Sequence, residues 1–168
     1  MPRKNIKILA DRPLIAFTID QALHSKYIDR TIVSTEDEEI ATISKQYGAE
    51  VPFIRPEYLA GDEVATIDVL SHSIAWLEEK DKFVFDILVL LHTTTPLRAV
   101  EDIDNCVEML VNSKAENVFS VTEAYRNPYF NMVEVDNFGY VKLVKEGDFA
   151  TRQNAPKVYD MNASIYVW

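Results

Sequence analysis

Glycine and cysteine are the scarcest informative residues in this chain. Four glycines among 168 residues exclude a flexible, Gly-rich linker between domains. The single cysteine, Cys106, cannot form an internal disulfide, and it falls in a helical pattern, which favours a buried structural thiol over a reactive one. The length is enough for one core of ordinary size, so we predict a single domain over residues 1–168.

Long apolar runs and an excess of positive charge are missing as well. No apolar stretch approaches the roughly 20 residues that a membrane-spanning helix requires, and no signal peptide precedes the first element. The formal net charge is −10, which argues against non-specific nucleic-acid binding because such binding needs a basic face. We therefore predict a cytoplasmic protein without membrane or nucleic-acid partners, in which a local cluster of Lys and Arg would meet any anionic ligand.

Helical and strand-like patterns alternate along the chain. The spacing of apolar residues predicts helices at 14–23, 36–47, 62–80 and 96–111. Short apolar runs predict strands at 31–34, 51–54, 83–91, 117–121 and 164–168, and the nearly all-apolar run 83–91 is typical of a central parallel strand. This order predicts an α/β fold with an open, mainly parallel sheet and helices on both faces.

The pattern changes between Asn127 and Thr151. Two strand-like runs, 130–135 and 140–144, are separated by Asp136-Asn-Phe-Gly139, whose Asn and Gly tolerate positive φ. This segment therefore predicts a β-hairpin that leaves the main sheet. The aromatic residues around it favour hairpin packing or an oligomer interface over a base-stacking surface.

Several polar residues fall where predicted strands end, which is where ligands bind in open α/β sheets. They are Lys4, Asn5, Arg55, His92, Thr94, Arg152, Gln153 and Asn162. Each also has a structural interpretation: a solvated basic N-terminus, a surface ion pair at Arg55, a hydrogen-bonded structural histidine, a helix cap at Thr94 and Thr95, or closure of a loop or turn. Strand-end position groups these residues but does not identify a ligand.

Six motifs occur in a recognisable order. They are Pro2-Arg-Lys-Asn5, Val33-Ser-Thr-Glu-Asp37, Tyr47-Gly-Ala-Glu-Val-Pro-Phe-Ile-Arg-Pro56, Leu90-Leu-His-Thr-Thr-Thr-Pro-Leu-Arg98, Asn127-Pro-Tyr-Phe-Asn131 and Arg152-Gln…Tyr166. Together they resemble the acylneuraminate cytidylyltransferases, which activate sialic-acid-like sugars as CMP-sugars. The resemblance spans nearly the whole chain and implies the Rossmann-type fold of nucleotide-diphospho-sugar transferases.

The resemblance implies a role for each matching position. Lys4 would offer its ammonium to the triphosphate of CTP as the catalytic cation, and Asn5, Arg55 and Asp62 would border the nucleotide. The residues that would border the acid sugar are His92, Thr94, Arg152, Gln153 and Asn162. Arg152 suits a carboxylate, whereas His92 replaces the family's usual Gln, which points to a related nonulosonic acid as acceptor. The segment 127–151 resembles a dimerisation arm, which implies a homodimer.

The chain also departs from the family pattern. The apolar strand and Gly-rich phosphate loop expected before Pro2 are missing, as is the region that holds the Mg²⁺-binding aspartates, so we expect truncation at both ends and metal ligands outside this chain. The leading hypothesis is transfer of CMP from CTP to a nonulosonic sugar, with Mg²⁺ as cofactor and release of pyrophosphate. The alternatives are a catalytically incomplete subunit that binds or dimerises, and a sugar-1-phosphate nucleotidyltransferase.

Overall fold

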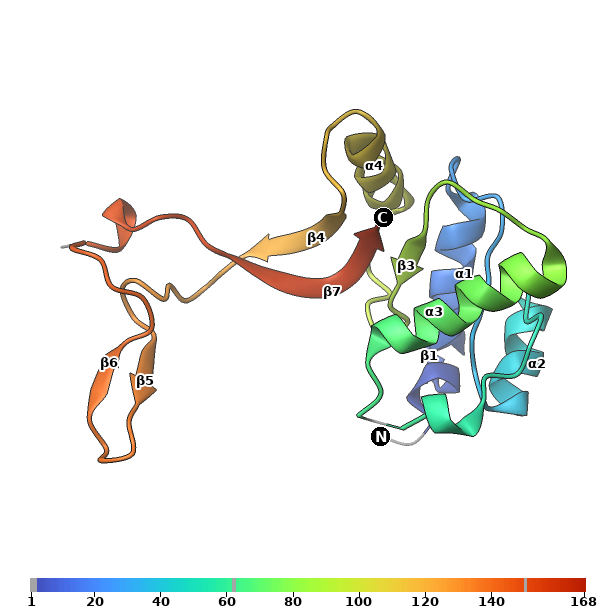
Figure 1. Cartoon of the computed structure of the whole chain (residues 1–168), viewed down its shortest axis with the longest axis horizontal. Helices are drawn as coiled ribbons and strands as arrows, with labels where there is room; N and C mark the ends of the chain where they lie inside the picture. The colour runs from blue at the N-terminus through green and yellow to red at the C-terminus, as the bar shows by residue number, and fades with distance from the viewer. Residues whose placement is uncertain (1–2, 62, 150) are drawn as a thin grey trace. The chain divides into compact units, whose positions relative to one another are not determined.

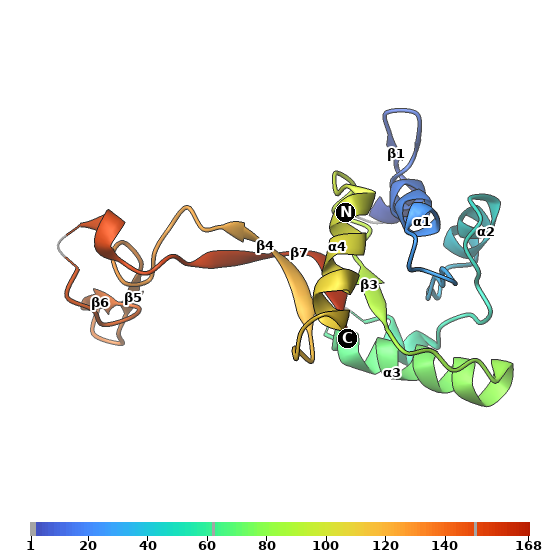
Figure 2. The same cartoon turned by 90° about the horizontal axis from the view of Figure 1, so that it is seen from above.

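The computed structural model describes residues 3–61, 63–149 and 151–168, and it divides the chain into two compact units (Figures 1 and 2). The first unit runs to Phe119 and also contains Ser164–Trp168. The second unit is Ser120–Ala163, which includes the predicted arm at 127–151. Asp62, one of the predicted nucleotide-binding residues, lies outside the described residues, as does Pro2 of the first motif.

Most helices of the chain belong to the first unit. In chain order its elements are η1 (Lys4–Ile6), β1 (Ile8–Leu9), β2 (Arg12–Pro13), α1 (Leu14–His24), α2 (Glu38–Gln46), η2 (Glu57–Leu59), α3 (Thr66–Trp76), a π-helical turn η3 (Leu77–Asp81), β3 (Val89–Leu91) and α4 (Val100–Val111). The strands β4 (Val118–Glu123) and β7 (Tyr159–Val167) run from this unit into the second. Each described helix is too short or too polar to cross a membrane.

Helix α1 begins where the sequence predicts, directly after Pro13. Its residues Ile15, Ile19 and Ala22 are buried, and the first two join Ile40 of α2 in one apolar core. This spacing places them on one face of the helix, so the apolar pattern alone predicts which side of α1 is covered. Leu23, the last residue of the predicted helix, is 48% exposed.

Helices α2 and α4 begin later than predicted, and at the start of each a carboxylate accepts a hydrogen bond from a backbone N–H group. Asp37 accepts hydrogen bonds from the N–H groups of Glu39 and Ile40 at 2.8 and 3.1 Å, so α2 begins at Glu38 and not at the predicted Glu36. Asp102 accepts from the N–H of Ala99 at 3.1 Å, so α4 begins at Val100. The helix predicted over 62–80 is shorter, with α3 followed by the π-helical turn η3.

The fold is of the predicted α/β class, but its strand pairing differs from a mainly parallel sheet. The three-stranded sheet has the order β3-β7-β4, and β3 pairs antiparallel with β7 through Val89↔Val167 and Leu91↔Ile165. The predicted strands 31–34 and 51–54 are not strands; one parallel bridge, Ile32↔Glu50, is described near them. The cause is topological: the last strand lies beside β3 and runs opposite to it, and a local apolar pattern does not encode strand order or direction.

A second apolar core lies between α4 and β7. Ile103 and Val107 of the helix pack with Ile165 and Val167 of the strand, and all four side chains are almost fully buried. Val167 is the last residue of β7, and the end of this strand, from Ser164 on, belongs to the first unit and its core.

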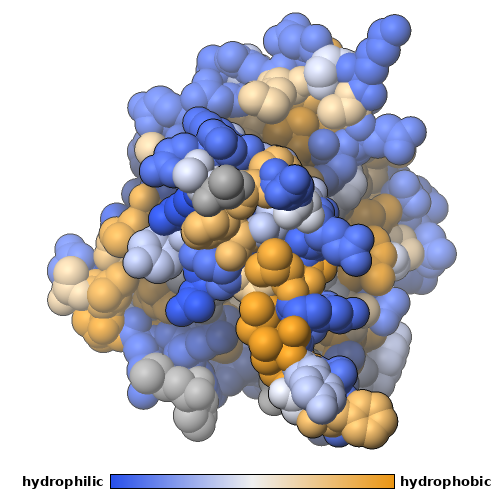
Figure 3. Space-filling view, turned by 90° about the vertical axis from the view of Figure 1, so that its left-hand side faces the viewer, coloured by the Kyte–Doolittle hydropathy of each residue, from blue (hydrophilic) through white to orange (hydrophobic). Residues whose placement is uncertain are grey.

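The second unit contains the predicted hairpin, which the structure confirms. Strands β5 (Val133–Val135) and β6 (Val141–Leu143) pair antiparallel, and Gly139 in the turn has a φ of 85°, which favours glycine. The unit also contains η4 (Arg152–Asn154). Figure 3 shows one face of the protein in space-filling form, with apolar surface between hydrophilic side chains.

Candidate functional site

The basic N-terminal segment forms the first part of the candidate site. Lys4 and Asn5 lie in η1, which packs against α1 and α2. Lys4 is exposed and makes no ion pair among the described residues. The Oδ1 atom of Asn5 is buried and has no hydrogen-bond partner among them. An unpaired buried acceptor is costly unless a ligand or water satisfies it, so Asn5 remains a candidate ligand contact.

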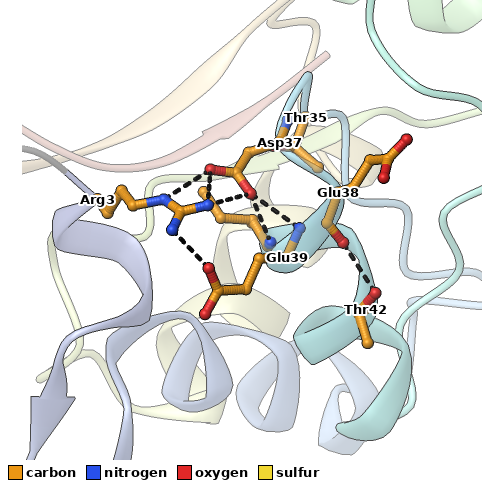
Figure 4. A network of polar contacts seen from close by, with 7 residues as sticks. Arg3, Thr35, Asp37, Glu38, Glu39 and Thr42 are labelled. Carbon is orange, nitrogen blue, oxygen red and sulfur yellow. Dashed lines mark hydrogen bonds and ion pairs between the residues drawn. The ribbon is translucent and has the colours of Figure 1, made fainter.

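Arg3 of the same segment is already occupied by protein carboxylates (Figure 4). Its Nη2 lies 2.7 Å from the Oδ2 of Asp37, and its Nη1 lies 2.5 Å from the Oε2 of Glu39. The hydrogen bond from Arg3, together with the backbone N–H groups of α2, lowers the pKa of Asp37. Arg3 therefore ties the N-terminal segment to the start of α2, and Lys4 is the cation beside it that a triphosphate could engage.

Arg55 combines an ion pair with an unpaired donor. Its guanidinium pairs with Glu36, as expected for a loop arginine, but its Nε is buried and has no described hydrogen-bond partner. Arg55 lines a largely apolar cavity of about 520 Å³ between α1, α3 and residues 83–91. The hydroxyls of Thr31 and Ser34, which line the same cavity, are also buried without a described partner. The polar atoms at this cavity are thus available to a ligand.

The loop from His92 to Arg98 follows β3 directly. The N–H of His92 donates to the carbonyl of Ser164 at 3.2 Å, and its imidazole lies 5.8 Å from the ring of Tyr166. Burial, and next the positive charge of Arg98, lower the pKa of His92, so the imidazole is neutral at pH 7. Thr94 is exposed in the turn and does not cap α4. The hydroxyl of Thr95 donates to the carbonyl of His92 at 3.0 Å.

Arg98, at the end of this loop, is a buried cation. Its side chain donates to the Oε1 of Gln21 at 2.9 Å, the Oγ1 of Thr18 at 3.0 Å, and the carbonyls of Ser164 and His92, both at 2.6 Å. Burial lowers its pKa to about 10. Arg98 therefore stays charged at neutral pH. It links α1, the His92 loop and Ser164 of β7.

The remaining predicted sugar-binding residues belong to the second unit. Arg152 and Gln153 lie in η4, where Arg152 donates to the carbonyl of Tyr125 at 2.9 Å and stacks over its ring. Asn162 lies inside β7, where its Oδ1 accepts from the hydroxyl of Ser120 at 2.7 Å. A guanidinium has five N–H donors, so the contact of Arg152 with Tyr125 leaves donors for a carboxylate.

The structure thus brings some predicted residues together and separates others. Lys4 and Asn5 are neighbours on η1, and His92 and Thr94 share one loop. The first-unit residues are connected through α1, which contacts η1 and also holds the His92 loop through Thr18 and Gln21. Arg152 and Gln153 are neighbours on η4, whereas Asn162 lies on β7, and all three belong to the second unit.

No described group of three or more His, Cys, Asp and Glu side chains could hold a metal ion. The carboxylates nearest the basic segment already pair with arginines: Asp37 and Glu39 with Arg3, and Glu36 with Arg55. The residues that the structure describes therefore do not fit the Mg²⁺ site that the resemblance implies.

Comparison with known proteins decides the family. A family model described as "Cytidylyltransferase" matches residues 1–167. The chain belongs to the cytidylyltransferase family. The predicted family is thereby confirmed, and the fold described above is that of a cytidylyltransferase.

Individual relatives agree with this assignment. The chain is 43% identical to the CMP-N,N'-diacetyllegionaminic acid synthase of Campylobacter jejuni over 98% of this chain and 70% of that protein. It is 35% identical to the synthase of the same name from Legionella pneumophila, over 99% of this chain and 71% of that protein. A solved CMP:2-keto-3-deoxy-manno-octonic acid synthetase, complexed with CTP, has a TM-score of 0.66 at 16% identity, over 100% of this chain and 68% of that one. This last likeness shows that the fold of the cytidylyltransferase is shared.

Sequence reasoning missed two residues of this cytidylyltransferase that organise the candidate site. Arg98 was recognised as part of a motif but not as a site residue, and Gln21 was not singled out. The available signal was that Arg98 is the one permanently charged residue in the motif 90–98. Gln21 carried no signal, because its partners, the carbonyls of Pro96 and Arg98, lie more than 70 residues away in the chain.

Proposed function

We propose that this protein transfers CMP from CTP to a nonulosonic acid, a sialic-acid-like sugar, and releases pyrophosphate. In the reaction a hydroxyl oxygen of the sugar attacks the α-phosphorus of CTP in line. The new O–P bond replaces the bond between the α-phosphorus and the bridging oxygen of pyrophosphate, and the hydroxyl proton is released. The observation that carries this proposal is the 43% identity to a CMP-N,N'-diacetyllegionaminic acid synthase over 98% of the chain.

The same relatives support a narrower choice of acceptor. The relatives at 43% and 35% identity are named for N,N'-diacetyllegionaminic acid, whereas a pseudaminic acid cytidylyltransferase of Campylobacter jejuni is 28% identical. We therefore propose a legionaminic-type acid as the preferred sugar. The neutral imidazole of His92 fits a hydrogen bond to such a sugar better than an ion pair with its carboxylate.

The proposal divides the work between two groups of residues. Lys4 supplies positive charge to the triphosphate, while Asn5 and Arg55 contact the nucleotide through their unpaired polar atoms. Asp62 stays part of the proposed nucleotide site. For the sugar, Arg152 binds the carboxylate, because a guanidinium fork matches the two oxygens of a carboxylate. The other proposed sugar contacts are His92, Thr94, Gln153 and Asn162.

Mg²⁺ and a cytoplasmic location remain parts of the proposal. Mg²⁺ would neutralise charge on the triphosphate, and since the described residues do not fit such a site, the proposal assigns it no ligand among them. We propose the cytoplasm as the location because CTP, the nucleotide substrate, is supplied there. Loss of turnover with EDTA, restored by excess Mg²⁺, tests the metal requirement.

The experiment is pyrophosphate release from CTP with a panel of acid sugars. The panel contains N,N'-diacetyllegionaminic, pseudaminic, N-acylneuraminic and 2-keto-3-deoxy-manno-octonic acids, and a second set replaces CTP by UTP, ATP or GTP with sugar 1-phosphates. We expect turnover with CTP and the highest kcat/KM with the legionaminic acid. Turnover in the second set alone would favour a sugar-1-phosphate nucleotidyltransferase. No turnover and no effect of CTP on the melting temperature would favour a non-catalytic subunit.

Two variants test the proposed sugar contacts. Arg152→Ala and His92→Ala should each raise the KM for the acid sugar about tenfold or more, which corresponds to the loss of one charge-assisted or buried hydrogen bond. The matched control is Arg126→Ala, because Arg126 is exposed and lies next in the sequence to Tyr125, the contact of Arg152. This control should leave the KM for the acid sugar unchanged. If sugar saturation is the same in all three variants, the assigned sugar pocket is wrong.

We also propose that the protein is a homodimer in which the hairpin meets a second copy. The β5–β6 register places Val133, Val135, Val141 and Leu143 on one face, opposite Glu134 and Lys142. The aliphatic side chains of that face are 38 to 66% exposed, and an isolated two-stranded ribbon is marginally stable in water. Val135→Glu should convert the dimer to a monomer in sedimentation velocity, while Glu134→Gln on the other face should not. A wild-type monomer would contradict the proposal.

A further inference from the structure

The charge of Arg98 has no counter-charge within its hydrogen-bond network. The side chain is 9% exposed, and the partners described for its guanidinium are two carbonyls, one amide oxygen and one hydroxyl, all neutral. Buried cations are costly unless hydrogen-bonded, and most are paired with an anion. With a pKa of about 10, the guanidinium nonetheless remains protonated at neutral pH. The loop therefore carries a buried positive charge, and the described groups that stabilise it are neutral hydrogen-bond acceptors.

The same hydrogen bonds determine where His92 lies. The N–H of His92 donates to the carbonyl of Ser164, which also accepts from Arg98. The carbonyl of His92 accepts from Arg98 and from the hydroxyl of Thr95. The carbonyl of His92 is thus held by Arg98 directly, and its N–H is held by the Ser164 carbonyl that Arg98 also binds. Fixing the backbone on both sides restricts the direction of the imidazole.

Gln21 completes a reciprocal clamp between α1 and the loop. Its Oε1 accepts from the Nε of Arg98, while its Nε2 donates to the carbonyls of Pro96 and Arg98 at 2.7 and 2.8 Å. Thr18, one turn earlier on α1, accepts from the Nη2 of Arg98. Since α1 also contacts η1, the clamp joins the loop of His92 to the helix beside Lys4 and Asn5.

We propose that Arg98 is a positioning residue for the acid sugar. Held by Gln21 and Thr18 on α1, it fixes the loop that carries His92 and provides an uncompensated positive charge behind that loop, which favours an anionic sugar over a neutral one. This inference rests on the proposed function. It assigns to Arg98 and Gln21 a role in sugar affinity that a purely structural arginine would not have.

Two substitutions change the charge of Arg98 and its contacts in different ways. Gln21→Glu keeps an acceptor for Arg98 and gives the guanidinium a carboxylate partner, which cancels the free charge, but it also removes the two hydrogen bonds from Nε2 to the carbonyls of Pro96 and Arg98. The pKa of His92 reports on the change of charge and not on the loss of these two bonds. Arg98→Lys keeps the charge but replaces the planar fork by an ammonium with three donors, which cannot reproduce the four bonds. Gln46→Glu and Arg126→Lys, at exposed positions, are the matched controls.

The measurements are Kd values for N,N'-diacetyllegionaminic acid and for CTP by calorimetry, and the pKa of His92 from NMR titration of its imidazole. We expect Gln21→Glu to weaken sugar binding by about tenfold or more while changing the Kd of CTP less than about twofold. The pKa of His92 should rise in this variant, because the positive charge that opposes its protonation is neutralised. Arg98→Lys should also weaken sugar binding, but the pKa of His92 should stay low.

The outcomes distinguish this inference from the proposed function. If the wild-type protein binds the sugar and Gln21→Glu matches Gln46→Glu in both affinities and in the pKa of His92, the inference fails and the proposed function stands. Equal weakening of sugar and CTP also overturns it, because that is the result of a general loss of structure. If the wild-type protein binds no acid sugar from the panel, both are overturned.

Discussion

Among the glutamines on the described helices, Gln21 is the one whose replacement by leucine should destabilise the first unit most. Leucine has nearly the size of glutamine but removes three hydrogen bonds: two from Nε2 to loop carbonyls and one accepted from the Nε of Arg98. Each neutral bond contributes about 1 kcal/mol and the bond to the charged group about 2 kcal/mol. The half-buried leucine returns about 1 kcal/mol of apolar burial. We expect a net loss of about 3 kcal/mol.

Urea denaturation followed by tryptophan fluorescence measures this loss. Both tryptophans, Trp76 and Trp168, lie in the first unit, so their emission reports on the unfolding of that unit. With a slope of about 2 kcal/mol per molar urea, a loss of 3 kcal/mol lowers the midpoint by about 1.5 M. The matched control is Gln46→Leu at the exposed end of α2, which should change stability by less than about 0.5 kcal/mol.

The result that would refute this reasoning is a midpoint for Gln21→Leu within about 0.25 M of that for Gln46→Leu, since this corresponds to about 0.5 kcal/mol. The clamp would then contribute nothing measurable to folding. A changed slope with an unchanged midpoint would instead indicate that the loop is released without unfolding of the unit.

Two further predictions concern the core and the pH dependence of stability. Ile103→Ala should lower the free energy of unfolding by about 2–5 kcal/mol, because Ile103 is fully buried against β7, whereas Met109→Ala on the exposed side of α4 should cost much less in the same urea titration. The pKa of His92 is lowered in the folded state, so the unfolded chain takes up the proton first as the pH falls below about 6.5, and stability should decrease there. His92→Gln should reduce the decrease between pH 7.5 and 5.5; a decrease as large as that of the wild-type protein would contradict the assignment.

Features with a local cause could be predicted from the sequence. Helix α1 forms directly after Pro13, and its buried face follows from the spacing of Ile15, Ile19 and Ala22. The hairpin forms because Asp136 to Gly139 supply a turn with positive φ at Gly139 between two β-branched runs. In each case the information lies within a few residues of the structure that it determines.

Features that depend on distant partners could not be predicted in the same way. The apolar runs at 31–34 and 51–54 resemble strands, yet a strand needs a ladder, and one bridge, Ile32↔Glu50, is described there. The antiparallel pairing of β3 with β7 joins Leu91 to Ile165, residues far apart in the chain. The starts of α2 and α4 were predicted too early for a related reason: the carboxylates of Asp37 and Asp102 accept from backbone N–H groups at these starts, and the backbone geometry decides which polar residue does so.

The candidate site follows the same division. The motifs were sufficient to select the loop at His92, since a polar run after an apolar strand is a local signal. They selected the residues expected to touch a ligand and passed over Arg98, whose acceptors on Thr18 and Ser164 are 80 and 66 residues away. In the sequence, a charged side chain with distant, neutral partners cannot be told from a loop arginine with a nearby anion, such as Arg55, which pairs with Glu36 19 residues away. The two arginines differ in burial and in the charge of their partners, which depend on the fold. For that reason a residue proposed to act through another, such as Arg98 through His92, emerges only from the structure, whereas the family could be predicted from the sequence and the contact residues stay a prediction.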